Sequence, residues 1–201
     1  MFLYYFNTRA LLYFMAQTPT TLIPLGFAAP AFTLPDTISG NVKSLDELRS
    51  DKATVIMFIC NHCPFVVHVI DELVKLANDY IAKGISFIAI CSNDIEKYPQ
   101  DGPDKMKQFA LRNNFPFPYL YDETQDVARA YSAACTPDFS IFDGDLKCVY
   151  RGQLDDSRPS NSKPVTGKDI REALDAVLAG KPVGADQKVS IGCNIKWKQK
   201  I

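Results

Sequence analysis

Two cysteines separated by two residues, Cys60 and Cys63, stand directly after an apolar run at 54–59 and before a long amphipathic pattern. The run is typical of a buried strand, and the pattern that follows is typical of a helix. A cysteine at a helix N-terminus lies at the positive end of the helix dipole, among backbone N–H groups without partners. Both effects stabilise the thiolate, which is the nucleophilic form of the side chain. The placement therefore predicts a redox-active dithiol.

The elements that hold this pair follow from the hydrophobic periodicity. Apolar residues recur at helical spacing from Val66 to Ile81, and a second apolar run at 85–91 predicts another buried strand. The remaining signals predict helices over 104–114, 122–131 and 168–179, a short strand over 118–121, and a hairpin over 138–150. This order of elements predicts an α/β fold with a central mixed β-sheet flanked by helices.

A small β-hairpin is expected before this core. The segment 29–34 alternates weakly between apolar and polar residues, and the tripeptide 39–41, Ser-Gly-Asn, is a turn signal. Ser44 followed by Glu47 has the sequence of a capping box, which predicts a short helix there. The predicted boundaries are an N-terminal extension and linker at 1–24, a domain at 25–182, and a polar C-terminal tail at 183–201.

The composition argues against several classes of partner. The 201 residues carry 22 basic and 23 acidic side chains, for a net charge of −1, and the two signs are mixed along the chain. Such a balance is not typical of a nucleic-acid-binding or polybasic membrane-binding surface. The length fits one domain with a sizeable core. The sequence leaves the oligomeric state open.

The first sixteen residues are mostly apolar and aromatic, but three polar residues at 7–9 divide them into runs too short to span a bilayer. They lack a basic N-terminal region, and residues 14–16 form a poor signal-cleavage site. We expect Met15 to be the natural start and the protein to be cytoplasmic. The alternative is an exported protein in which residues 1–16 act as a signal.

Three motifs follow one another in an order typical of one superfamily. The predicted strand at 54–59 leads into Cys60-Asn61-His62-Cys63-Pro64. The pair Thr136-Pro137 precedes the predicted hairpin at 138–150, and the segment 26–30 is Gly-Phe-Ala-Ala-Pro. Over roughly 25–180 the chain resembles the thioredoxin superfamily, and within it the redoxin branch (AhpC/TSA; peroxiredoxin-like and TlpA-like). The resemblance implies a thioredoxin-like fold with an N-terminal β-hairpin extension, and a cis-proline at Pro137 that faces the cysteine pair.

The resemblance also implies roles for these residues. Cys60, exposed at the helix start, is the expected nucleophile, His62 is expected to stabilise its thiolate, and Cys63 is expected to resolve the mixed disulfide. Thr136 and Pro137 are expected to form a platform whose backbone pairs with an extended substrate. The implied activity is that of a thiol–disulfide oxidoreductase that needs no organic cofactor or metal. Its partner is a protein or small-molecule disulfide or thiol, and the direction of transfer stays open.

The four other cysteines divide into two groups. Cys91 and Cys148 lie on apolar strands and are expected to be inert core residues. Cys135 stands beside the predicted platform, and Cys193 lies near the C-terminus. For both of these, an additional redox-active thiol and a structural thiol are open interpretations. The second histidine, His68, is expected on the solvated face of its helix.

A peroxiredoxin-like thiol peroxidase with an antioxidant role is the main alternative. One cysteine of the pair would be oxidised to a sulfenate and the other would resolve it. Peroxiredoxins carry Pro-x-x-x-Thr/Ser-x-x-Cys, and aligning Cys63 with the peroxidatic cysteine puts Cys60 at the Thr position and Ile56 at the Pro position. The arginine expected near Pro137 is also absent. These departures argue against an efficient peroxidase.

A metal carrier, such as a copper protein, is the third interpretation. It would combine the two cysteines with a distant histidine, whereas both histidines here lie next to the motif. The scattered remaining cysteines do not supply a second ligand pair for zinc. Proton delivery is unassigned at this stage, because Thr54 stands where thioredoxins keep a buried acid. Asp155 and Asp156 are further acids without an assigned role.

Overall fold

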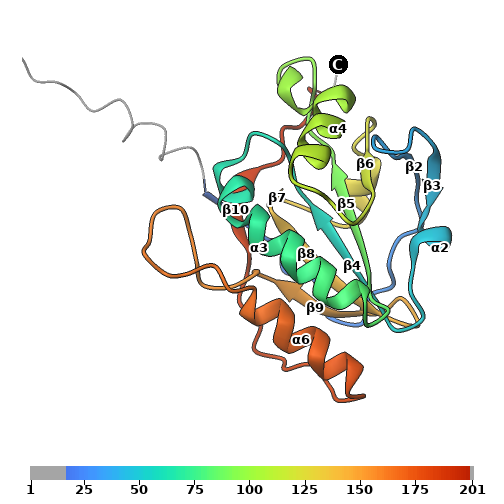
Figure 1. Cartoon of the computed structure of the whole chain (residues 1–201), viewed down its shortest axis with the longest axis vertical. Coiled ribbons are helices and arrows are strands. Elements are labelled where there is room, and N and C mark those ends of the chain that lie inside the picture. The colour runs from blue at the N-terminus through green and yellow to red at the C-terminus, as the bar shows by residue number, and fades with distance from the viewer. Residues whose placement is uncertain (1–16, 200–201) are drawn as a thin grey trace, which may run out of the picture.

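Five strands form the central sheet in the order β6-β5-β4-β8-β9 (Figure 1). The computed structural model describes residues 17–199. The strands are β4 (Ala53–Phe58), β5 (Ser86–Cys91), β6 (Tyr119–Tyr121), β8 (Asp138–Asp143) and β9 (Cys148–Gly152). β4 pairs in parallel with β5 and antiparallel with β8, so the sheet is mixed as predicted. All six residues of β4 are buried, which explains its unbroken apolar sequence: both faces of a central strand are covered.

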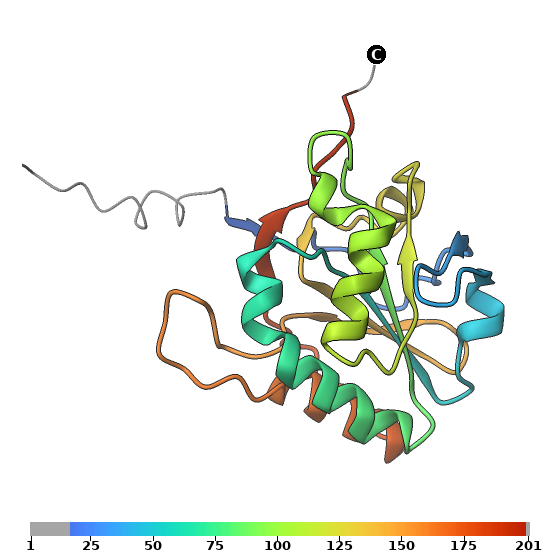
Figure 2. The ribbon, with the colours of Figure 1, turned by 45° about the horizontal axis from the view of Figure 1, so that its top comes forward.

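Helices cover the sheet, which separates two hydrophobic clusters. They are α3 (Pro64–Ile81), α4 (Pro103–Arg112) and α6 (Lys168–Leu178), with the shorter α2 (Leu45–Leu48), α5 (Asp126–Ala130) and the 3-10 turn η2 (Pro99–Asp101). Figure 2 shows α3 and α4 crossing the same side of the sheet. Leu73 of α3, Phe109 of α4 and Leu174 of α6 belong to the cluster on that side, together with both motif cysteines. The dithiol is therefore anchored in the larger core.

The N-terminal hairpin is confirmed. β2 (Thr33–Pro35) pairs antiparallel with β3 (Val42–Ser44). At the end of β3 the hydroxyl of Ser44 accepts from the backbone N–H of Glu47, and the Glu47 carboxylate accepts from the Ser44 N–H at 2.8 Å. This is the predicted capping box, and it begins α2.

The helix predicted from Asp122 begins later than expected. α5 starts at Asp126, but the Asp122 carboxylate still accepts from the backbone N–H groups of Val127 and Ala128, at 3.4 and 2.9 Å. Asp122 also accepts a hydrogen bond from the Ser92 hydroxyl at 2.8 Å. The acid therefore caps the helix from a distance and ties it to the end of β5.

The C-terminal segment is not the polar tail that the sequence suggested. Ile191–Asn194 forms β10, the middle strand of a second sheet between β1 (Gln17–Pro19) and β7 (Cys135–Thr136). β1 likewise lies within the predicted linker. These strands are too short to leave a period in the sequence, and their pairing joins segments more than fifty residues apart. The predictions of a start at Met15 and of a signal at 1–16 concern residues outside the described part of the chain. Within 17–199, no helix has both the length and the apolar character needed to cross a membrane.

Candidate active site

The dithiol lies where β4 leads into α3. Cys60 follows the last strand residue by two positions, and Cys63 is the N-cap of α3, with Pro64 in the first turn. Proline fits there because the first helical N–H needs no partner within the helix. Both cysteines are buried, and Cys60 is the more exposed of the two only by 1% against 0%. Both belong to the larger hydrophobic cluster, which also includes Cys193 of β10.

The predicted platform contacts both sulfurs. The Thr136-Pro137 peptide bond is cis, as the resemblance implied. The Cys60 Sγ lies 3.5 Å from the Thr136 hydroxyl, and the Cys63 Sγ lies 3.0 Å from the Thr136 carbonyl oxygen. One residue thus touches each sulfur with a different group. The hydroxyl can donate to a thiolate, whereas the carbonyl can only accept a thiol proton.

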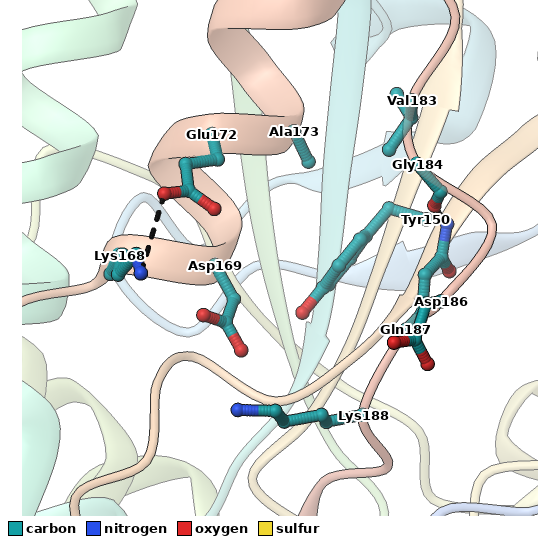
Figure 3. A pocket seen from close by; sticks show the side chains of 10 residues that line it. All are labelled: Tyr150, Lys168, Asp169, Glu172, Ala173, Val183, Gly184, Asp186, Gln187 and Lys188. Atoms are coloured by element: carbon teal, nitrogen blue, oxygen red, sulfur yellow. Dashed lines mark hydrogen bonds and ion pairs between the residues drawn. The ribbon is translucent and has the colours of Figure 1, made fainter.

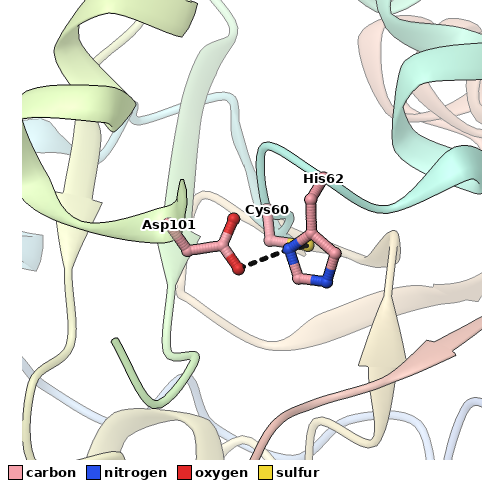
Figure 4. A group of neighbouring side chains, drawn as sticks. All are labelled: Cys60, His62 and Asp101. Atoms are coloured by element: carbon pink, nitrogen blue, oxygen red, sulfur yellow. Dashed lines mark hydrogen bonds and ion pairs between the residues drawn. The ribbon is translucent and has the colours of Figure 1, made fainter. Parts of the chain in front are cut away.

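A buried carboxylate that the sequence did not reveal completes the site. Asp101 Oδ2 lies 2.7 Å from His62 Nδ1, and the Asp101 side chain is fully buried whereas the His62 side chain is 24% exposed (Figure 4). Asp101 also accepts from the Asn61 backbone N–H at 2.9 Å and from the Asn93 side-chain amide at 2.8 Å. The His62 Nδ1 in turn lies 3.8 Å from the Cys60 sulfur. The same ring nitrogen therefore faces both the Asp101 carboxylate and the Cys60 sulfur, with the carboxylate much the nearer of the two.

Asp101 takes the place of the acid that is missing at Thr54, but it arrives from another element. It ends the turn η2, forty residues after the Asn61 that it contacts. Only its position in a Pro- and Gly-rich turn distinguishes it in the sequence, and that pattern does not point to a site. The neighbouring Tyr98 ring stacks on His62 with centroids 5.5 Å apart. η2 and its flanks therefore fix the orientation of the imidazole.

The two thiols ionise as one pair. Burial opposes ionisation of Cys63, but hydrogen bonds from the Cys193 and Cys60 thiols and the Thr136 hydroxyl outweigh it and lower the pKa of Cys63 to about 2. The hydrogen bond to Cys63, burial and the Asp101 charge raise the pKa of Cys60 well above its usual value. The pair therefore loses its first proton at low pH and keeps its second proton to high pH.

The shared proton can rest on either sulfur. Hydrogen-bond donors around Cys63 favour the charge there. The Thr136 carbonyl, 3.0 Å from the Cys63 sulfur, favours a thiol at Cys63 instead and leaves the charge on Cys60. These two influences on Cys63 therefore oppose each other, and the proton of the pair is placed by their balance.

The comparisons with known proteins now decide the family. The model of the AhpC/TSA family matches residues 25–151. The chain belongs to the AhpC/TSA family. A curated Mycobacterium tuberculosis protein named "Putative peroxiredoxin Rv2521" is 28% identical over 117 residues, which cover 58% of this chain and 69% of that protein.

Several solved structures are also similar to this AhpC/TSA chain. An uncharacterized conserved protein from Geobacillus kaustophilus is 64% identical, with a TM-score of 0.92 over 93% of this chain and 99% of the other. A hypothetical protein from Sinorhizobium meliloti is 46% identical, with a TM-score of 0.89 over 91% and 100%. A secreted disulfide oxidoreductase of Mycobacterium tuberculosis, 18% identical with a TM-score of 0.55 over 74% and 95%, shares the thioredoxin-like fold.

The other cysteines of this AhpC/TSA protein lie in two settings. All six are free thiols and all are buried. Burial raises the pKa of Cys148 to about 12 and that of Cys91 further still, which matches their expected place in the core. Burial likewise raises the pKa of Cys135, whose thiol lies 3.5 Å from the Pro137 carbonyl. Cys193 differs because its thiol hydrogen-bonds to Cys63.

Cys60, His62 and Asp101 also offer metal-ligand atoms within 4.8 Å of one another. A thiolate, an imidazole and a carboxylate form a donor set that suits zinc or another transition metal. Here the His62 Nδ1 and the donors of Asn61 and Asn93 already occupy the Asp101 oxygens. A metal ion would have to displace these contacts, so the geometry favours the hydrogen bonds of Asp101 over metal binding.

His68 is not the solvated residue that its helical position suggested. Its Nε2 lies 2.7 Å from the Ser157 hydroxyl, and the Ser157 backbone N–H donates to Asp155 at 2.8 Å. Asp155 also accepts from the backbone N–H groups of Thr166 and Gly167. Both residues therefore hold the 155–167 loop against α3. Neither contact involves the dithiol.

A pocket between α6 and the segment 183–188 is distinct from the dithiol (Figure 3). Acidic and basic side chains face one another across it, among them Asp169 of α6 and Lys188. No cysteine is among its lining residues, which are Tyr150, Lys168, Asp169, Glu172, Ala173, Val183, Gly184, Asp186, Gln187 and Lys188. The pocket therefore adds no group to the thiol chemistry.

Proposed function

We propose that this protein is a thiol–disulfide oxidoreductase that uses Cys60 and Cys63. The observation that carries the proposal is the placement of the dithiol on Thr136: the Cys60 sulfur lies 3.5 Å from its hydroxyl, the Cys63 sulfur lies 3.0 Å from its carbonyl oxygen, and a cis-proline follows. Such an arrangement supplies a thiolate and a resolving thiol within one site. The AhpC/TSA family and the thioredoxin-like fold support the same class of redox chemistry.

The reaction then has two balanced steps. The Cys60 thiolate attacks one sulfur of a substrate disulfide, forms a mixed disulfide with it and releases the other substrate sulfur as a thiolate. The Cys63 thiolate next attacks the Cys60 sulfur, closes the Cys60–Cys63 disulfide and releases the second substrate thiolate. Two electrons pass from the dithiol to the substrate. The one proton that the ionised dithiol retains ends on one substrate sulfur, and the other substrate thiolate takes its proton from solvent. The same steps run in reverse with a reduced substrate, according to the two potentials.

The partly exposed edge of the site lies at His62. Cys60 and Cys63 are buried, whereas about a quarter of the His62 side chain is exposed. The imidazole lies 3.8 Å from the Cys60 sulfur, with Tyr98 stacked against it. We propose that a substrate displaces this pair of rings to reach Cys60.

Trapping tests the assignment. Reduced Cys63→Ser should accumulate a stable mixed disulfide with glutathione disulfide, because Cys60 attacks and nothing resolves the adduct. Cys60→Ser should form far less, and Cys148→Ser, a core cysteine variant, should exchange as the wild type does. Mass spectrometry of the intact protein measures the adduct. Equal trapping in both motif variants would contradict the assigned roles, and no exchange by the wild type would reject the activity.

A thiol peroxidase is the second candidate, favoured by the AhpC/TSA family and by the 28% identity to a protein named as a peroxiredoxin. The buried guanidinium of Arg151 does not serve such a site, because it donates to Ser140 and Ser132 and pairs with Asp138. Stoichiometric hydrogen peroxide added to reduced protein separates the two candidates. Thiol loss far faster than that of a free cysteine would establish the peroxidase.

A further inference from the structure

The protein's own strand β10 lies on the platform proposed for substrates. β10 pairs antiparallel with β7, so that Cys193 stands opposite Thr136 and Asn194 opposite Cys135. On either side of this register, the Ile195 backbone N–H donates to the Ala134 carbonyl at 3.1 Å and the Ser190 hydroxyl donates to the Pro137 carbonyl at 2.7 Å. An extended segment is therefore held across the cis-proline, which is the mode of contact expected for a substrate strand.

The sequence of β10 is fitted to this close approach. A Cβ added at Gly192 would lie 2.0 Å from the Thr136 carbonyl oxygen, a distance that no side chain tolerates. Glycine therefore lets the strand approach the residue that also contacts both motif sulfurs. Figure 2 shows β10 passing beside the start of α3, where Cys63 is the N-cap.

This register brings a third thiol to the dithiol. Cys193 belongs to the same buried cluster as Cys60 and Cys63, and with 9% of its surface accessible it is the most exposed of the three. Cys193 pairs with Thr136, whose carbonyl oxygen lies 3.0 Å from the Cys63 sulfur, and hydrogen bonding from the Cys193 thiol helps to lower the pKa of Cys63. Cys135, its neighbour across the ladder, makes its contacts with Thr20 and the Pro137 carbonyl. The geometry therefore singles out Cys193 as the thiol that meets the dithiol.

We propose that β10 is a built-in substrate strand and that Cys193 exchanges with the Cys60–Cys63 disulfide. The inference rests on the proposed oxidoreductase function. In the exchange the Cys193 sulfur attacks Cys63, a Cys63–Cys193 bond forms, and the Cys60–Cys63 bond breaks. The electron pair of the broken bond stays on Cys60, which takes the proton that Cys193 gives up. No external oxidant or reductant enters, since one disulfide replaces another.

This exchange, which we call the relay, would move the disulfide from the Cys60–Cys63 pair to the more exposed Cys193. Cys193, with 9% of its surface accessible, is the most exposed of the three cysteines. Its strand is also linked to the acid of the site, because the Lys196 backbone N–H donates to the Asn93 side chain, whose amide donates to Asp101. Movement of β10 would therefore disturb the hydrogen bonds of Asp101, the partner of His62.

Peptide mapping tests this proposal directly. In Cys60→Ser, trypsin places Cys63 in the peptide 53–75, Cys193 in 189–196 and Cys135 in 130–147, each as the only cysteine. After reduction, oxidation with one equivalent of diamide and alkylation, we expect 53–75 to be joined to 189–196 in most of the oxidised protein. Cys60→Ser/Cys193→Ser should show no internal crosslink. A crosslink to 130–147 instead, or none in folded Cys60→Ser, would overturn the proposal.

The wild type provides a second readout if the variant does not fold, as judged by circular dichroism. Oxidised with one equivalent of diamide, it should yield a fraction of 53–75 joined to 189–196 beside the internal Cys60–Cys63 disulfide. If every oxidised molecule carries only the internal disulfide and Cys193 is fully alkylated, the relay is wrong. The oxidoreductase function is tested separately, by exchange of the wild type with glutathione disulfide. Exchange would support that function even if the relay is wrong, and no exchange would reject it.

Discussion

His62 Nδ1 lies 2.7 Å from Asp101 Oδ2, in a contact that joins a partly exposed residue of the Cys-x-x-Cys motif to a fully buried carboxylate 39 positions further along the chain. The Asp101 oxygens have no other charged partner among the contacts described above, only the amide donors of Asn61 and Asn93. The carboxylate therefore both orients the imidazole and adds negative charge near Cys60. These two effects act in opposite directions on the thiolate.

Replacing Asp101 separates the two effects. In Asp101→Asn the carboxylate charge that raises the pKa of Cys60 is lost, so Cys60 should ionise at lower pH and the disulfide should become more oxidising. Thiolate absorbance near 240 nm and the potential against glutathione measure both. The weakened contacts to His62 and Asn61 should destabilise the protein by roughly 1–3 kcal/mol. Asp104→Asn, at an exposed acid three residues away, is the matched control. An unchanged Cys60 titration in Asp101→Asn would contradict the electrostatic role.

The reduced protein should be most stable near pH 9. The pKa of Cys63 is lowered to about 2, so its contribution grows as the pH rises towards the unfolded value of 9.0 and is lost as the pH falls. The pKa of Cys60 is raised, so its contribution is present below 9.0 and is lost as the pH rises towards the folded value.

Urea unfolding of reduced wild type and Cys63→Ser between pH 4 and 9 measures this dependence. The difference in the free energy of unfolding should increase with pH, by at most about 1.4 kcal/mol per unit for one proton. A difference that is flat with pH would show that the dithiol does not ionise early.

Gly192→Ala tests the fit of β10 on the platform. The new Cβ would lie 2.0 Å from the Thr136 carbonyl, so the strand has to shift and the free energy of unfolding should fall by roughly 1–3 kcal/mol. The displaced strand should also expose Cys193 and speed its reaction with a thiol reagent such as dithionitrobenzoate. Gly184→Ala, whose added Cβ meets nothing within 4 Å, should change neither quantity. Equal behaviour of the two variants would show that β10 does not pack as described.

Leu73 tests whether α3 holds the site through the core. The side chain is fully buried in the cluster that contains both motif cysteines, so Leu73→Ala should lower the free energy of unfolding by about 2–5 kcal/mol. Val67→Ala, on the exposed face of the same helix, should cost far less, because 54% of Val67 is accessible. Thermal unfolding followed by circular dichroism measures both variants. Similar losses in the two would contradict the described orientation of α3.

The sequence by itself determined the parts of this protein that depend on neighbouring residues. The apolar run into Cys60, the helical period after Cys63 and the capping box at Ser44 are each set within a few positions, because dipoles, caps and periodicity act over one or two turns. The order of these elements was enough to predict the mixed sheet, and the resemblance to the redoxin branch implied the cis-proline at Pro137.

Only the tertiary structure decided what surrounds the dithiol. Asp101 reaches His62 from η2, and Cys193 reaches Cys63 from a four-residue strand that the sequence suggested was a tail. Neither segment has a period or a motif that marks it, since its role depends on which distant backbone it pairs with. Burial of Cys60 has the same origin: accessibility belongs to the packed chain and not to the helix start that predicted it.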